Sequence, residues 1–338
     1  MAFVIRAAGR DDIEALYRMA KGTGGGFTNL PPNRPTLEAK LARAAEAFSR
    51  KEDTIEDELF MFILENTETG KAVGTCLIFS QIGTEWPFYN YRVGSISQTS
   101  KELKKTFRAE LLTLCTDLEG TSEVGGLFLD PAERSAGVGK LLARSRYLFI
   151  GMHRARFADR TIAELRGAID DAGNSPFWDG LAGQFFDMSF READDFNAVH
   201  GNQFIADLMP KHPIYTALLP DTARAVMGKP HQSGRPAMRM LEKEGFAWES
   251  YIDIFDGGPA VTVMTDRIRT IRDSTSDKVT RIDEAGDGEP ALIATGRLAD
   301  YRCCIGSVSA RKDGVTIDRG SAGLLRVSPG DLVTWAPA

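Results

Sequence analysis

The sequence predicts an α+β protein in which a mixed, mostly antiparallel sheet precedes a small β-rich C-terminal domain. Apolar runs rich in β-forming residues follow one another between residues 59 and 115, as in an antiparallel meander. This meander leads into one strand, a glycine-rich turn and a helix over residues 124–157. Beyond about residue 272 only short β-like runs remain, so the predicted domains are residues 1–270 and 271–338.

Composition limits the classes of function. The chain has 338 residues, 43% of them hydrophobic and 26% charged, as expected for a globular protein of about two domains. A net charge of −6 argues against a nucleic-acid or anionic-membrane surface as partner. No apolar stretch approaches the about 18 residues of a spanning helix, and the N-terminus lacks a signal-peptide pattern. The four cysteines show no metal-site spacing, and we expect a cytoplasmic protein with no metal.

Residue periodicity predicts the N-terminal elements. Asp11 or Asp12 caps a helix that runs to Lys21, and Thr36 caps a second helix over residues 37–51. The other predicted elements are a strand at 3–6, a glycine-rich loop at 22–28 and meander strands at 59–65, 72–82, 89–97 and 107–115.

The strand that ends at Leu129 is followed by a turn with glycines at fixed spacing. Gly137 and Gly139 lack a Cβ, so backbone N–H groups at the start of the following helix can approach an anion. A Walker A loop would need serine or threonine after Lys140, and a Rossmann loop would need a third glycine. The spacing R-x-x-G-x-G from Arg134 instead resembles the acyl-CoA loop of the GNAT acyltransferase superfamily.

Helices and strands alternate in the rest of the first domain, and the second domain is predicted to be β-rich. Cys303 and Cys304 form an adjacent pair within a β-like run, which is typical of buried packing. The predicted elements are strands at 161–169, 248–255, 303–310, 314–317 and 332–335, helices from 175, at 221–227 and at 234–245, and a polar segment at 273–290.

Acyl transfer from a CoA thioester sets two proton tasks, because the attacking amine loses a proton and the leaving thiolate gains one. Histidine suits either task because its pKa lies near neutrality. Of the four histidines, His231 lies in a loop before a helix and is slightly favoured, whereas the neighbours of His153 predict a solvated helix face. Candidates for binding a charged substrate are the carboxylates Glu164, Asp170, Asp171, Asp253 and Asp256, and the guanidinium groups of Arg92 and Arg166.

Longer blocks of sequence point to one family. They are TGGGFTNLP (23–31), PFYNYRVG (87–94), LFLDP (127–131), ELRGAIDDAGNSPFW (164–178), FIADLMPKHPIYTALL (204–219) and LEKEGFAWESYIDIFDGGP (241–259). In these blocks the chain resembles the bacterial arginine N-succinyltransferases of arginine catabolism, over residues 1 to about 270. Gln98 and Gln232 depart from the residues expected at their positions in relatives.

The resemblance implies a GNAT-like fold and transfer of succinyl from succinyl-CoA to the α-amine of L-arginine. It also implies that the backbone of Leu127 contacts succinyl-CoA, with Arg134, Gly137 and Gly139 in the CoA loop, and that His231 is the proton donor. Succinyl-CoA would be a co-substrate, with no permanently bound cofactor. The α-amine is the reasonable acceptor, because a guanidinium group almost never loses its proton.

Two alternatives stay open from the sequence. The first is the same chemistry on ornithine or another basic amino acid, because the sequence does not reveal the side-chain pocket. The second is a non-catalytic acyl-CoA-binding partner subunit, which the retained Arg134, Gly137, Gly139 and His231 argue against. Either reading allows a homo- or hetero-oligomer.

Overall fold

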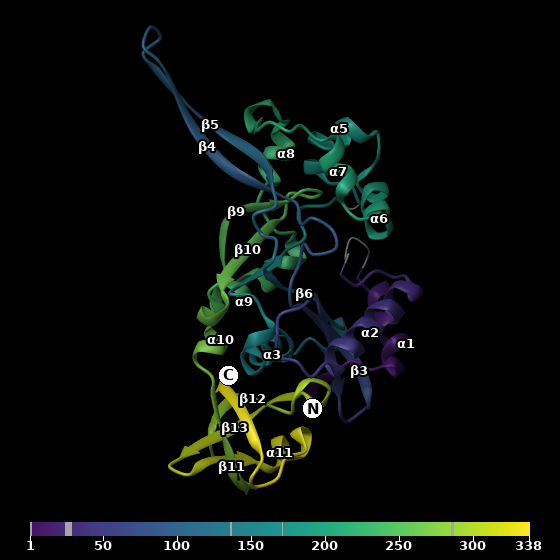
Figure 1. The fold of residues 1–338 in the computed structure, drawn as a ribbon, viewed down its shortest axis with the longest axis vertical. Helices are drawn as coiled ribbons and strands as arrows, with labels where there is room; N and C mark the ends of the chain where they lie inside the picture. The colour runs from purple at the N-terminus through teal and green to yellow at the C-terminus, as the bar shows by residue number, and fades with distance from the viewer. Residues whose placement is uncertain (1, 24–28, 136, 171, 285–286) are drawn as a thin grey trace. The chain divides into compact units, whose positions relative to one another are not determined.

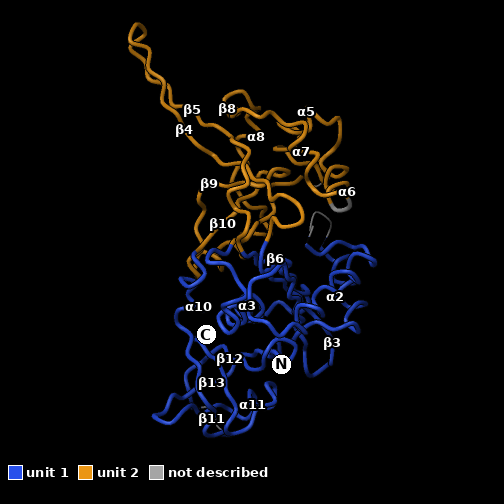
Figure 2. Tube along the Cα trace, viewed as in Figure 1, with its two compact units in different colours: residues 1–81, 122–161, 264–338 blue, residues 82–121, 162–263 orange. Residues whose placement is uncertain are grey.

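A computed structural model describes residues 2–23, 29–135, 137–170, 172–284 and 287–338. Most of the predicted glycine-rich loop (24–28) and Asp171 therefore lie outside the described residues. The chain divides into two compact units, shown in Figure 2. Unit 1 contains residues 1–81, 122–161 and 264–338, and unit 2 contains residues 82–121 and 162–263.

An antiparallel sheet forms the centre of the N-terminal part of unit 1. Its strands occur in the order β1 (Phe3–Ala7), β2 (Leu59–Asn66), β3 (Lys71–Phe79) and β6 (Ser122–Leu129). Nearly every side chain of β2 is buried, which agrees with its continuous apolar sequence. The predicted hairpin of β2 and β3 is confirmed, with Leu59 opposite Phe79 and Asn66 opposite Lys71.

The helices of this part of unit 1 are α1 (Ile13–Lys21), α2 (Arg34–Ser49) and α3 (Val138–Met152). The predicted cap of α2 is wrong, because Asn33 is the N-cap and its side chain accepts from the backbone N–H of Thr36. The buried face of α3 meets β2 through Phe149, whose ring centroid lies 4.9 Å from those of Phe60 and Phe62. These aromatic contacts hold α3 against the sheet.

The C-terminal segment of unit 1 is a closed five-stranded barrel. Following hydrogen-bonded neighbours, the order is β13, β14, β11, β15 and β12, and β12 pairs with β13 to close the ring. Closure leaves no free barrel edge. Its strands are β11 (Thr275–Asp283), β12 (Glu289–Thr295), β13 (Arg302–Arg311), β14 (Gly314–Asp318) and β15 (Leu332–Pro337). In the chain, helix α10 (Arg269–Arg272) precedes β11, and helix α11 (Arg319–Leu325) connects β14 to β15.

The barrel joins the N-terminal sheet within unit 1. Strand β13 pairs with β1, so that Cys303 faces Ile5 and Arg302 faces Arg6. Figure 1 shows β11, β12 and β13 of the barrel together with α11. The hydroxyl of Tyr301 donates to the backbone oxygen of Ser145 on α3 at 2.6 Å. The compact units therefore do not follow the predicted boundary at residue 270, which stays a prediction.

Unit 2 is built on a second run of antiparallel strands. Their order is β10 (Pro259–Met264), β9 (Ala247–Asp253), β4 (Asn90–Ser100), β5 (Lys105–Cys115) and β8 (Ile214–Tyr215), and β7 (Arg160–Glu164) lies next to β10. Strands β4 and β5 pair along their full length as a long hairpin. The predicted strand 161–169 is too long, because residues after Glu164 form a loop.

The described residues of unit 2 form six α-helices around its core. The core gathers around the buried rings of Trp178, Phe177 and Phe255. The predicted helices near 175, 221 and 234 are confirmed, whereas α5 to α7 were not predicted. The helices are α4 (Pro176–Gly180), α5 (Gly183–Phe186), α6 (Phe190–His200), α7 (Gln203–Leu208), α8 (Asp221–Val226) and α9 (Arg235–Glu244).

Candidate active site

The four residues predicted to contact CoA lie together on one strand–turn–helix segment of unit 1. Leu127 lies near the end of β6, Arg134 follows a short 3-10 helix at Pro131–Glu133, and Gly137 and Gly139 lie at the start of α3. Asp130 begins the turn, and its carboxylate accepts from the backbone N–H of Ala132 at 3.0 Å. This is the geometry that the glycine spacing predicts.

The two loop glycines have different physical reasons to be glycine. Gly137 has φ of +95°, in the left-handed region where a Cβ is strained, and it forms the N-cap of α3. Gly139 lies in the first turn of the helix, and a Cβ added there would meet no protein atom within 4 Å. Packing of the described residues therefore does not require glycine at position 139, whereas close approach of a ligand would.

Backbone geometry also singles out Leu127. Strand β6 pairs Phe128 with Thr75 but Gly125 with Leu77, so β6 carries one extra residue at this point. Such a bulge interrupts the ladder and re-aims the backbone of the bulged residues. Leu127 lies in the bulge, which suits the backbone role that the family resemblance implies for it.

The start of α3 has the electrostatics of an anion site. Its first-turn N–H groups and the positive end of the helix dipole favour a phosphate group. Arg134 is exposed beside the turn, and its Nε donates to the backbone oxygen of Leu129 at 3.4 Å. The loop residues therefore fit a diphosphate such as that of CoA.

His231 lies in unit 2, in a loop that two backbone hydrogen bonds hold in place. The N–H of His231 donates to the oxygen of Arg166 at 2.7 Å, and the N–H of Gly228 donates to the oxygen of Gly257 at 2.8 Å. The imidazole caps the 3-10 helix Gln232–Gly234, because Nδ1 accepts from the N–H of Ser233 at 3.3 Å. In the neutral ring this hydrogen bond leaves the proton on Nε2.

Arg166, whose backbone supports His231, has an unusual side chain. Its Nε is buried and has no hydrogen-bond partner among the described residues. A buried donor without a partner is costly, which makes Arg166 a candidate to bind a substrate carboxylate. Asp194 lies close enough to feel its charge, and burial followed by repulsion from Asp253 raises the pKa of Asp194 to about 6.

Asp253 and Asp256 are structural carboxyls rather than free ligands for a cation. Asp253 accepts from the N–H groups of Phe255 and Asp256, at 2.7 and 2.8 Å, and Asp256 is buried with 7% of its surface exposed. Asp256 in turn accepts from Gly167 at 2.7 Å. Burial raises the pKa of both carboxyls. They hold the turn between β9 and β10 against the end of β7.

Other sequence candidates take supporting positions. The predicted solvated face for His153 is wrong: the ring is 6% exposed, its Nδ1 pairs with the oxygen of Phe149, and its Nε2 accepts from Leu298. Burial lowers its pKa to about 4. Arg92 is exposed and pairs with Asp117, whereas Glu164 accepts from Asn90. Cys303 and Cys304 are buried, as predicted.

Sequence reasoning missed a buried carboxyl on β6. Glu123 is 6% exposed and accepts from Asn29 at 3.1 Å. Burial raises its pKa, and burial lowers the pKa of the nearby Lys40 to about 8. The signal available in the sequence was a glutamate directly before the apolar run that begins at Val124.

Comparison with known proteins decides the family. A family profile described as arginine N-succinyltransferase beta subunit matches residues 3–270, and the profile of its C-terminal domain matches residues 277–337. The chain belongs to the arginine N-succinyltransferase family. It is 40% identical over 337 residues to the arginine N-succinyltransferases of Escherichia coli O139:H28 and Shigella flexneri, which covers 98% of this chain and 96% of each relative.

A solved structure is similar to the arginine N-succinyltransferase chain over nearly its whole length. Subunit AI of the arginine/ornithine succinyltransferase from Pseudomonas aeruginosa matches with a TM-score of 0.90 and 31% identity, covering 99% of this chain and 98% of that one. The predicted GNAT-like α+β fold with a small C-terminal β region is confirmed. The predicted acyltransferase class and arginine N-succinyltransferase activity are confirmed at the level of the family. Membership implies a CoA thioester as co-substrate.

The described residues contain no helix long and apolar enough to cross a bilayer. Within the same residues, no group of three or more histidine, cysteine or acidic side chains has the arrangement of a metal site.

The four residues of the predicted CoA loop lie together in unit 1, and His231 lies in unit 2 with Arg166 and Asp194.

Proposed function

We propose that this arginine N-succinyltransferase transfers succinyl from succinyl-CoA to the α-amine of L-arginine, with the loop from Arg134 to Gly139 as the CoA site and His231 as the proton donor. The observation that carries the proposal is the open space beside Gly139 at the start of α3, within a chain that matches the family from residue 3 to residue 270. Products are N2-succinyl-L-arginine and CoA.

The proposed reaction balances around the thioester carbonyl. The neutral α-amine attacks the carbonyl carbon, the C–S bond breaks, and the sulfur leaves as the CoA thiolate. An α-amine with an ordinary pKa of about 8 loses its proton at modest cost, whereas the guanidinium group stays protonated. His231, as the imidazolium ion, gives the proton on Nε2 to the thiolate and becomes neutral. The attacking amine nitrogen loses its proton to solvent or a carboxylate.

The surroundings of His231 support a donor role. Its Nδ1 is held by Ser233, which leaves Nε2–H as the group that can point away from the loop. Among the described residues, the buried Nε of Arg166 has no hydrogen-bond partner. Its guanidinium group suits the fork geometry of a carboxylate, and both arginine and succinyl groups carry one. Arg166 is therefore the proposed carboxylate-binding residue of unit 2.

Replacing His231 by alanine tests the assignment. His231→Ala should lower kcat by about 100-fold or more with little change in succinyl-CoA binding, the usual scale for losing an acid–base group. Release of the CoA thiol, followed with a chromogenic disulfide reagent, reports turnover, and calorimetry reports binding. His212→Ala is the matched control, because His212 is an exposed histidine of the same unit. Equal turnover in the two variants would remove His231 from the mechanism.

Ornithine is the second candidate acceptor, and one comparison favours it. The Pseudomonas aeruginosa relative is named an arginine/ornithine succinyltransferase. Both amino acids present the same α-amine and α-carboxylate, so they would share the proposed chemistry. The ratio of kcat/KM for arginine and ornithine, measured with the same preparation, decides between them.

A non-catalytic partner subunit is the remaining alternative. It would bind succinyl-CoA without releasing thiol when arginine is added, so one assay separates the two. The proposal further includes a cytoplasmic location, succinyl-CoA as a co-substrate without a permanently bound group, and a division into residues 1–270 and 271–338. Assembly into a homo- or hetero-oligomer is compatible with each of these points.

A further inference from the structure

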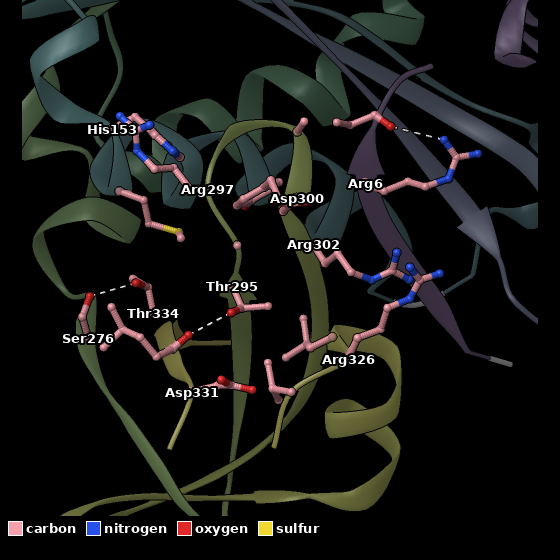
Figure 3. Close-up of a pocket in the computed structure, with 18 of the residues that line it drawn as sticks. Arg6, His153, Ser276, Thr295, Arg297, Asp300, Arg302, Arg326, Asp331 and Thr334 are labelled. Atoms are coloured by element: carbon pink, nitrogen blue, oxygen red, sulfur yellow. Dashed lines mark hydrogen bonds between the residues drawn. The ribbon is translucent and has the colours of Figure 1, made fainter. Parts of the chain in front are cut away.

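Unit 1 contains a polar cavity that the proposed reaction does not use. Its volume is about 880 Å³, and it lies beside β1, the end of α3 and the barrel strands (Figure 3). Four arginines line it: Arg6, Arg297, Arg302 and Arg326. None of the residues of the CoA loop is among its lining residues.

Two of these arginines face each other across a strand pair. Arg6 on β1 and Arg302 on β13 are direct partners in the antiparallel register. Like charges placed opposite one another destabilise a sheet unless something neutralises them. Arg6 is neutralised, because Nη1 lies 2.8 Å from Asp12 and Nε lies 2.7 Å from Glu65. Among the described residues Arg302 forms no ion pair, and Glu65, which is bonded to Arg6, attracts it from a greater distance.

A third arginine is turned toward Arg302. Arg326 ends α11 in the left-handed conformation, with φ of +61°, which is uncommon for a residue with a Cβ. Its guanidinium group lies beside that of Arg302 in Figure 3. Nε of Arg302 donates to the backbone oxygen of Leu324 at 2.6 Å, and among the described residues neither arginine forms an ion pair. Burial, and then repulsion from Arg326, lowers the pKa of Arg302.

The other charged or titratable residues that line the cavity are Arg297, His153, Asp300 and Asp331. Arg297 pairs with Asp53 at 2.6 Å, and His153 is neutral at physiological pH. Asp331 accepts from the N–H of Ser328, and Asp300 also lines the cavity. Among the described residues that line the cavity, the arginines that form no ion pair are therefore Arg302 and Arg326.

We propose that Arg302 and Arg326 bind the oxyanion of a small metabolite, either a carboxylate or a phosphate. Paired guanidinium groups offer several parallel N–H donors, which match both oxyanions and relieve the repulsion between the two side chains. The cavity volume is that of an ordinary metabolite site. Ser276, Thr295 and Thr334 add hydroxyl groups to its wall, and Leu325 and Val327 add apolar surface.

This site is separate from the proposed CoA loop. Gly151 and Met152, at the last turn of α3, line the cavity, whereas the CoA loop leads into the first turn of the same helix. A helix of 15 residues is about 22 Å long. A metabolite in the cavity would therefore touch the same helix as CoA, at its opposite end.

Calorimetric titration of the full chain with succinate and, separately, with inorganic phosphate tests the proposal. Titration of the same protein with sodium chloride at matched ionic strength is the control. At least one of the two anions should bind saturably. Arg326→Asn should lower the affinity for that anion by at least about tenfold, because a charged hydrogen-bond pair is lost. Asparagine tolerates the left-handed backbone of position 326, so the fold is kept.

Arg311→Asn is the matched control. Arg311 is an exposed arginine on the same strand as Arg302 and does not line the cavity, so its loss should leave the affinity unchanged. Preference for succinate or phosphate identifies the oxyanion. The proposal is overturned if neither anion binds, if Arg326→Asn binds as tightly as the parent, or if CoA with arginine displaces the anion.

Discussion

Two glycines two residues apart illustrate how a structural role and a functional role separate at the scale of one residue. Gly137 needs its positive φ, whereas Gly139 has an ordinary helical backbone and open space beside it. Gly139→Ala should therefore keep or raise the melting temperature, because alanine favours a helix by about 1 kcal/mol over glycine. The same change should raise KM for succinyl-CoA, because the new methyl group occupies the space where the diphosphate approaches.

Gly137→Ala should change the melting temperature in the opposite direction from Gly139→Ala. A Cβ at φ of +95° costs about 1–2 kcal/mol, so its melting temperature should fall. Thermal unfolding and steady-state kinetics of both variants make the comparison. If Gly139→Ala leaves KM for succinyl-CoA unchanged, the CoA loop does not approach its ligand through this glycine.

His153 predicts how stability depends on pH. Its folded pKa of about 4 lies below the ordinary value of about 6.5, because the ring is buried. As the pH falls, His153 therefore takes up a proton at a higher pH in the unfolded chain than in the folded protein. The contribution of His153 to the free energy of unfolding should be fully present above pH 6.5. It should fall by about 3 kcal/mol as the pH is lowered to 4.

Thermal unfolding of the parent and of His153→Gln between pH 7 and pH 4 measures this effect. The variant should be less stable at pH 7 and should lose less stability on acidification. His200→Gln serves for comparison, because His200 is exposed. Parallel pH profiles for the parent and His153→Gln would show that this ring does not control the acid sensitivity.

Residue types and spacing could predict the CoA loop because its signal is local. Arg134, Gly137 and Gly139 lie within one turn and one helix start, so their spacing determines their geometry. The role of His153 could not be predicted in this way. Its surroundings depend on Leu298, which is 145 residues distant in the chain, and no local pattern reveals that contact.

At the scale of elements, the hairpin of β4 and β5 stands out because, among the described residues, the two strands of its outer half pair with each other and with no third strand. Strand β9 contacts β4 at Asn90–Arg92, and β8 contacts β5 at Leu111 and Leu112. Farther out, Ile96 and Phe107 lie on one face and are 37% and 48% exposed.

Phe107→Thr should change the free energy of unfolding by no more than about 0.5 kcal/mol, because threonine suits a strand and the ring buries little surface. Leu112→Ala, at a fully buried position of the same strand, should instead cost about 2–5 kcal/mol. Chemical denaturation compares the two. A large loss for Phe107→Thr, or a change in the mass of the native particle, would mean that another surface covers this face.

Helices and strands with strong local signals were predictable. The apolar runs of β2 and β3, the Pro176 start of α4 and the Gly245 end of α9 all carry signals within a few residues. Helices α5 to α7 were missed, although Ser189 and Glu192 form a capping box that marks the start of α6. Strand β11 was missed because its sequence is polar, with Val279 as its buried apolar side chain.

At the scale of the molecule, the sequence suggests a separate C-terminal domain, whereas contacts join that segment to the first part of unit 1. The change in composition near residue 272 is real, but composition does not reveal which surfaces pack together. Strand β13 continues the sheet of β1, and Tyr301 packs its ring 5.5 Å from Phe62 and 5.1 Å from Phe149.

This arrangement predicts that the barrel and the N-terminal sheet unfold together. Tyr301→Ala should destabilise unit 1 by about 3–5 kcal/mol, because the ring is 1% exposed and its hydroxyl donates to Ser145. Leu332→Ala is the control in the same barrel, since Leu332 is 58% exposed and should be nearly neutral. Hydrogen exchange of the backbone amides of α3 and of β12 reports on the N-terminal sheet and on the barrel. Equal acceleration of exchange at both in Tyr301→Ala supports one cooperative unit. Acceleration confined to β12 would show that the barrel folds independently.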